Sequence, residues 1–117
     1  MTKEQILIRR IKEHEDKALR EVYKANRQAF VDFSARFGLD KEDVLDIYQD
    51  AMVVFCENAR KGKLDTLQSS ISTYIFAVGK YMIYARLKKN GRQVSMEELP
   101  EDPDRFVMQS DGLEDPD

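Results

Sequence analysis

The chain has 117 residues, which is long enough for one domain with a modest core but not for two. Of its residues 42% are hydrophobic and 35% charged. The single cysteine, Cys56, excludes an internal disulfide and is typical of a reducing compartment. No apolar run is long enough for a membrane span, and the chain shows no signal segment, so we expect a cytoplasmic protein. The formal net charge of -3 is unevenly distributed, since residues 1–96 hold 18 of the 19 basic residues but only 13 of the 22 acidic ones.

Two amphipathic helices are predicted in the first third of the chain. Over 2–14, Ile6, Leu7 and Ile11 recur at helical spacing. The second helix is expected over 17–37, with Glu15 or Asp16 placed to cap it and Gly38 placed to end it. Its apolar stripe consists of Leu19, Val22, Tyr23, Asn26, Phe30, Phe33 and Phe37.

A third helix is predicted over 41–60, with Asp40 at its capping position and Gly62 just after its end. One broad face is apolar and the opposite face is acidic. The apolar set is Val44, Leu45, Ile47, Tyr48, Ala51, Met52, Val54 and Phe55, and the polar set is Glu42, Asp43, Asp46, Gln49 and Asp50.

A fourth helix is expected from a cap at Ser69 or Ser70 to about Asn90, after a connecting loop. The stretch 71–92 contains five cations, four aromatic residues and no carboxylate. A single nucleic acid strand would suit that composition, through phosphate neutralisation and base stacking. Composition alone fits equally well a core helix with a solvated basic edge.

The remainder of the chain is acidic and poor in apolar residues. From Glu97 onward nine carboxylates face one cation, Arg105, and three prolines interrupt the segment. Such a segment cannot bury enough apolar surface to offset its ordering entropy, so we expect a flexible tail over 95–117 after a domain over 1–94. The fold class predicted is all-α, a small bundle of about four helices.

Catalytic constellations are not evident. His14 is the only histidine and sits at a helix end. Cys56 has no second histidine to activate it, so it is expected to be a small buried residue. Asp43, Asp46 and Asp50 share a helix face, but without a Glu-x-x-His helix opposite them a solvated face is favoured over a metal site. We expect no enzyme activity, no cofactor and no metal.

Three segments in order, Ala18 to Gly38, Asp40 to Asn58 and Ser72 to Arg92, carry a resemblance to a known family, and two blocks within them match its pattern. Asp46 to Met52 reads DIYQDAM, and Tyr74 to Lys80 reads YIFAVGK. In this order and helical register they resemble region 2 of bacterial RNA polymerase sigma factors of the extracytoplasmic-function type, over about residues 5–93. The first block is fairly specific, whereas the second would be weak alone because Tyr74 stands where the family has Trp.

The resemblance implies a transcription initiation domain that binds core RNA polymerase and promoter DNA. In the family, the polar face of the third helix docks on the clamp helices of the largest polymerase subunit, and Asp46, Gln49 and Asp50 occupy those positions. Their helical spacing lets them share one face. Without the resemblance, an ordinary solvated acidic face would be favoured.

The resemblance also implies recognition and melting of the promoter minus-ten element on its single-stranded non-template strand. The loop at 61–70 corresponds to the part that holds a flipped base. The positions that correspond to strand contacts, or that place cations beside them, are Lys61, Lys63, Tyr74, Lys80, Tyr81, Arg86, Lys88, Lys89 and Arg92. Tyr81 and Ala85 depart from the family pattern, so promoter sequence preference cannot be transferred.

Three further expectations follow. The family's region 4, which reads the minus-thirty-five element, has no counterpart in the 117 residues, so we expect a fragment of a longer factor. An anti-sigma factor is a further partner that the resemblance implies, although no residue indicates one. The alternative hypothesis is a helical protein–protein interaction domain that does not bind DNA.

Overall fold

The protein folds as an all-α bundle in a computed structural model that describes residues 2–91. The α-helices are α1 (Lys3–Lys12), α2 (Asp16–Ser34), α3 (Lys41–Arg60) and α4 (Ile71–Lys89), and a short 3₁₀ turn, η1 (Ala35–Phe37), follows α2. The expected helical class and helix order are confirmed. The predicted tail and Arg92 lie outside the described residues.

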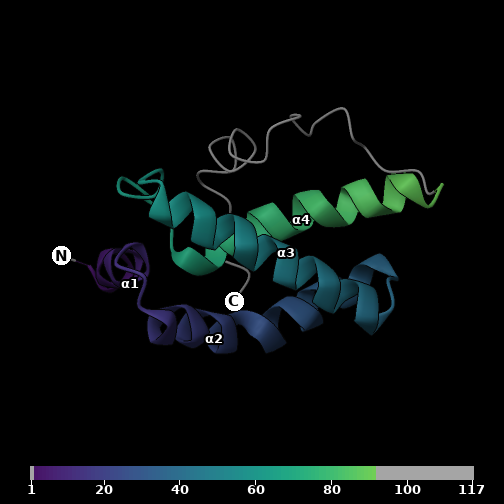
Figure 1. Cartoon of the computed structure of the whole chain (residues 1–117). Coiled ribbons are helices and arrows are strands. Elements are labelled where there is room, and N and C mark those ends of the chain that lie inside the picture. Colours follow the sequence, from purple (N-terminus) through teal and green to yellow (C-terminus); the bar gives the residue numbers. More distant parts are fainter. Residues whose placement is uncertain (1, 92–117) are drawn as a thin grey trace.

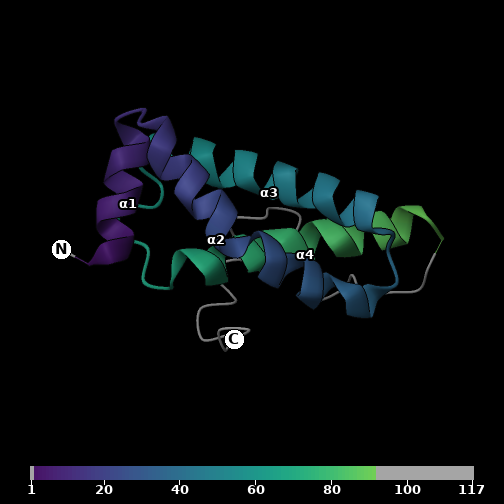
Figure 2. The same ribbon diagram turned by 90° about the horizontal axis from the view of Figure 1, so that it is seen from below.

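Helices α2, α3 and α4 run roughly lengthwise through the bundle, and α1 crosses one end of it (Figures 1 and 2). Helix α3 packs against each of the other three α-helices. Helices α3 and α4 are antiparallel, because Asp43 in the first turn of α3 contacts Arg86 in the last turn of α4. Helix α1 contacts Asp65 after α3 and Ile71 at the start of α4, so it crosses the end where α3 stops and α4 begins.

The core is centred on the faces predicted for α2 and α3. Phe30, Tyr48, Phe55 and Ile75 are completely buried, and the Phe30 ring lies 5.3 Å from that of Tyr48 and 5.5 Å from that of Phe76. The predicted burial of Cys56 is also confirmed. Helix α1 differs from expectation: Ile8 is buried and Ile6 is 45% exposed, because α1 turns Leu7, Ile8 and Ile11 toward the bundle.

The helices begin and end close to the predicted residues, but their capping hydrogen bonds differ from the prediction. Ser70 accepts a hydrogen bond from the Thr73 N–H, as a helix cap should. Glu15 and Asp40 occupy the capping positions of α2 and α3, but neither side chain makes a capping hydrogen bond. Helix α2 ends at Ser34 rather than Phe37, because its last turn tightens into η1 before Gly38 takes a left-handed conformation with φ of 73°.

Two left-handed residues end helices at the α1 end of the bundle. Gly62 (φ 82°) follows α3, and the N–H groups of Gly62 and Lys63 donate to the carbonyls of Ala59 and Asn58. His14 (φ 65°) follows α1 in the same way and is the one non-glycine residue with positive φ among residues 2–91. None of the helices in this part of the chain is both long and apolar enough to span a bilayer.

Candidate functional site

The side chains predicted to dock a protein partner lie together on the surface of α3. Asp46, Gln49 and Asp50 are all exposed, on the side of α3 that faces away from the core. We call these three residues the acidic face. One turn further along, Val53 is 54% exposed, which is unusual for a large apolar side chain. The arrangement gives carboxylate and amide acceptors beside an apolar contact, as a basic amphipathic partner helix would need.

The rotation of α3 that exposes the acidic face is fixed by Tyr48. This side chain is fully buried, and its hydroxyl donates a 2.6 Å hydrogen bond to the backbone carbonyl of Tyr23 on α2. Burial, together with the neighbouring Tyr23, raises the pKa of the Tyr48 hydroxyl far above its ordinary value. Tyr48 therefore stays a protonated donor and locks α3 against α2, with its sequence neighbours Asp46 and Gln49 turned outward.

The cations predicted for nucleic acid contact have different surroundings along α4. Lys88 and Lys89 are exposed in the last turn. Arg86 is half-buried, and its guanidinium pairs with the Asp43 carboxylate at 3.2 Å. Lys80 is half-buried and lies over the Tyr84 ring, with Nζ 5.6 Å from the ring centroid. Only the last turn of α4 therefore presents lysine ammonium groups fully to solvent, and we call Arg86, Lys88 and Lys89 the cationic end.

Tyr74 is a core residue, which corrects the expectation that its ring stacks on a base from the surface. Its side chain is 2% exposed, its ring packs 6.0 Å from that of Phe55, and its hydroxyl accepts a 2.7 Å hydrogen bond from the buried Asn58 amide. The physical reason is that this part of α4 lies between α2 and α3. Residues 74–79 are consequently all buried, and no face of this segment is left for a ligand.

Tyr81 is more accessible to a ligand than Tyr74. It is half-buried and lines a groove of about 270 Å³ between α3 and α4. Asp50 of the acidic face lines the same groove, as do Arg86 and Lys89 of the cationic end. The two predicted surfaces thus adjoin along the α3–α4 groove, rather than lying on opposite sides of the protein.

The remaining predicted contacts lie at the other end of α4. Lys61 and Lys63 are exposed in the connection between α3 and α4, residues 61–70, which we call the α3–α4 loop. At 1.5 Å per residue, the length of α4 puts this loop about 27 Å from Lys89. A nucleic acid strand that contacted both groups of cations would have to span this distance past residues 74–79, which are buried.

Several side chains that shape these surfaces were not predicted to do so. Asp43 was expected on the solvated polar face of the third helix but pairs with Arg86, and Glu4 reaches from α1 to the first N–H of α4. Partners separated by 43 and 67 positions leave no signal in helical spacing. Among residues 2–91, no group of three or more His, Cys, Asp and Glu side chains is arranged to hold a metal ion.

Comparisons with known proteins identify no relative of this chain. Neither a scan against protein-family models nor searches of curated proteins and of solved structures found a match.

Proposed function

We propose that this chain is a sigma region 2-like domain of a transcription initiation factor. It would bind the clamp helices of RNA polymerase through the acidic face and a promoter strand through α4 and the α3–α4 loop. The observation that carries the proposal is the exposure of Asp46, Gln49 and Asp50, of which Asp50 lines a groove whose other side holds Tyr81 and Lys89.

The polymerase half of the proposal is supported by the register of the acidic face. Asp46, Gln49 and Asp50 are spaced at one helical turn and are all solvent-exposed, so they can contact one partner helix together. We expect Asp46→Ala and Gln49→Ala to abolish capture by an isolated clamp coiled coil. Asp32→Asn, at an exposed carboxylate on α2, is the matched control and should leave capture unchanged. Equal capture by all four proteins would contradict the assignment.

The DNA half of the proposal depends on the cationic end and on Tyr81. Exposed lysines neutralise phosphates and release counterions, so removing one phosphate contact to a single strand lowers the slope of log K against log salt by about 0.7. Lys88→Ala and Lys89→Ala should each show this loss on a single-stranded oligonucleotide, whereas Lys24→Ala on α2 should not. An unchanged slope in both test variants would remove the cationic end from the proposed interface.

A second candidate function is a helical protein-interaction domain that does not bind DNA. It is favoured by an apolar groove of about 420 Å³ between α2 and α3, lined in part by Leu19, Tyr23, Met52 and Val53. It is also consistent with the burial of Tyr74 and the pairing of Arg86. Binding of single-stranded DNA with a normal salt dependence would exclude this alternative.

A further inference from the structure

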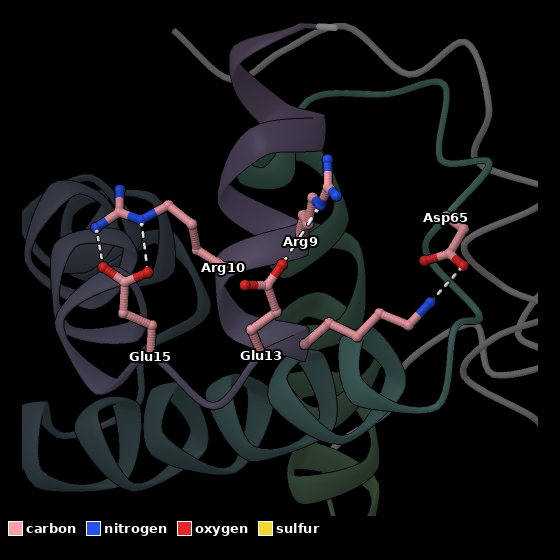
Figure 3. Close-up of polar contacts among 6 residues, drawn as sticks. Arg9, Arg10, Glu13, Glu15 and Asp65 are labelled. Atoms are coloured by element: carbon pink, nitrogen blue, oxygen red, sulfur yellow. Dashed lines mark hydrogen bonds and ion pairs between the residues drawn. The ribbon is translucent and has the colours of Figure 1, made fainter.

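The α3–α4 loop is held in place from outside by α1. The Lys12 ammonium contacts the Asp65 carboxylate in the middle of the loop, with Nζ 2.7 Å from Oδ2. Figure 3 shows Asp65 turned toward α1 to make this contact. At the end of the loop, Glu4 Oε2 accepts a 2.8 Å hydrogen bond from the backbone N–H of Ile71. Two side chains of α1 thus contact the loop and the residue that follows it.

Apolar packing accompanies these two polar contacts. Leu64 of the loop is 4% exposed, and Ile8 of α1 is 3% exposed. Both residues line a hollow of about 430 Å³ between α1 and the loop. The backbone hydrogen bonds that Asp65 and Leu67 make within the loop are short-range turns, to Gly62 and Leu64. The contacts from α1 therefore add to the packing of Leu64 and Leu67 against the core in holding the loop.

The contact from Glu4 has a specific physical advantage. Ile71 is the first residue of α4, so its N–H has no acceptor within the helix. Ser70 satisfies the Thr73 N–H, which leaves the Ile71 donor to the carboxylate of Glu4. A negative charge at this position also interacts favourably with the helix dipole. Glu4 thereby fixes the start of α4 relative to α1.

We propose that Glu4 and Lys12 form a clasp that positions the α3–α4 loop to receive a nucleic acid strand. The choice of a nucleic acid as ligand rests on the proposed function, whereas the clasp itself is defined by the Lys12–Asp65 and Glu4–Ile71 contacts. Lys12 has a second effect, because it neutralises a carboxylate in the same loop as Lys61 and Lys63 that would otherwise repel phosphate. Glu4 and Lys12 are positioning residues, since neither is required to touch the strand.

The first test measures the loop itself by amide hydrogen exchange. Lys12→Ala removes an exposed ion pair and should leave the protein folded, while the amides of Asp65 and Leu67 exchange about two- to fivefold faster. Glu4→Gln should accelerate exchange at Ile71. Arg9→Ala is the matched control, because Arg9 lines the same hollow but pairs with Glu13 of its own helix at 3.3 Å (Figure 3). Wild-type exchange rates in Lys12→Ala and Glu4→Gln would overturn the clasp.

The second test measures affinity for a single-stranded oligonucleotide at low salt in a double-mutant cycle. Lys12→Ala should weaken binding about two- to fivefold in the native chain and by much less in an Asp65→Asn background, because the repulsive carboxylate is then gone. Equal losses in both backgrounds would mean that Lys12 contacts phosphate directly and is not a clasp. If the native chain binds no oligonucleotide while exchange changes as expected, the proposed function fails and the clasp stands.

Discussion

Individual side chains show how far chemical type alone can mislead. Tyr74 and Tyr81 are both tyrosines on α4, yet Tyr74 is 2% exposed in the core whereas Tyr81 lines an open groove. The difference arises from the helix face that each occupies. A tyrosine hydroxyl that accepts a bond from a buried amide contributes to folding, and it needs no ligand to explain it.

We therefore predict that Tyr74→Phe lowers stability without changing DNA affinity. The substitution removes the hydroxyl that accepts the Asn58 amide hydrogen and leaves a buried donor deprived of this partner. The expected loss is about 1–2 kcal/mol of unfolding free energy, measured by urea denaturation. Tyr81→Phe is the paired comparison at a half-buried position and should cost less. A stable Tyr74→Phe variant with weakened oligonucleotide binding would contradict the assignment of Tyr74 to the core.

His14 offers a stabilising substitution at the same scale. Its φ of 65° is strained for a residue with a side chain, and its N–H ends α1 by donating to the carbonyl of Ile11. His14→Gly should raise the unfolding free energy by about 0.5–1 kcal/mol, as read from thermal or urea unfolding. His14→Ala keeps the strain and should give no gain. A loss of stability in the glycine variant would show that the imidazole makes a favourable contact here.

At the scale of helices, the crossing of α2 and α4 depends on Gly79. A Cβ at this position would lie 2.3 Å from Cε1 and 2.6 Å from Cζ of Phe30. Alanine favours a helix over glycine by about 1 kcal/mol, but this overlap forces Phe30 or the helix itself to move. We expect Gly79→Ala to destabilise the protein by about 1–3 kcal/mol.

The control for this prediction is a second substitution at the same contact. Phe30→Leu shortens the side chain that the new methyl group would meet, so Gly79→Ala should cost less in that background than in the native chain. Chemical denaturation of the four proteins gives the coupling energy. Additive effects, or stabilisation by Gly79→Ala alone, would show that α2 and α4 are not in the close contact described.

The junction of α1 and α2 introduces a pH dependence. Arg10 donates two hydrogen bonds to Glu15, from Nε at 3.1 Å and Nη2 at 2.9 Å (Figure 3). These bonds, and then the charges of Arg10 and Lys17, lower the pKa of the Glu15 carboxyl below its ordinary value. Because the pKa is lower in the folded state, the stabilisation is present above the ordinary pKa and is lost as pH falls through the folded value.

Glu15→Gln should therefore be less stable than the native chain at about pH 7 and equally stable at about pH 2, where both lack the charge. The measurement is urea denaturation of both proteins across this pH range. A stability difference that stays constant down to the lowest pH would mean that the charge of Glu15 plays no part. The ion pair joins α1, which carries the proposed clasp, to the start of α2.

At the scale of the whole molecule, the fold could be predicted because its helices repeat apolar residues at helical spacing and because Gly38 and Gly62 follow the segments that end at η1 and α3. The rest depends on contacts between segments that are far apart in sequence. Asp43 and Arg86 could not be paired from spacing. The burial of Tyr74 was indicated by the apolar run 74–79, since a helix segment that is apolar on every side is buried, but this signal was outweighed by the aromatic and cationic composition of 71–92. The acidic face was predictable because Asp46, Gln49 and Asp50 lie within one helix and one turn of each other.

The adjoining of the acidic face and the cationic end has a consequence for binding. Asp50 lines one side of the α3–α4 groove, and Lys89 and Tyr81 line the other. A basic partner helix that covers Asp50 would neutralise the negative charge of this residue next to the proposed strand site. Under the proposed function, binding of polymerase and of DNA should therefore be compatible, since the two proposed contacts lie on different helices.

The most direct measurement is fluorescence anisotropy of a labelled single-stranded oligonucleotide titrated with this chain, with and without an isolated polymerase clamp coiled coil. We expect binding in both series, with a further rise in anisotropy when the coiled coil joins the complex, and no such rise with the Asp46→Ala and Gln49→Ala variants. Displacement of the oligonucleotide by the coiled coil, or failure of the chain to bind either one, would contradict the account.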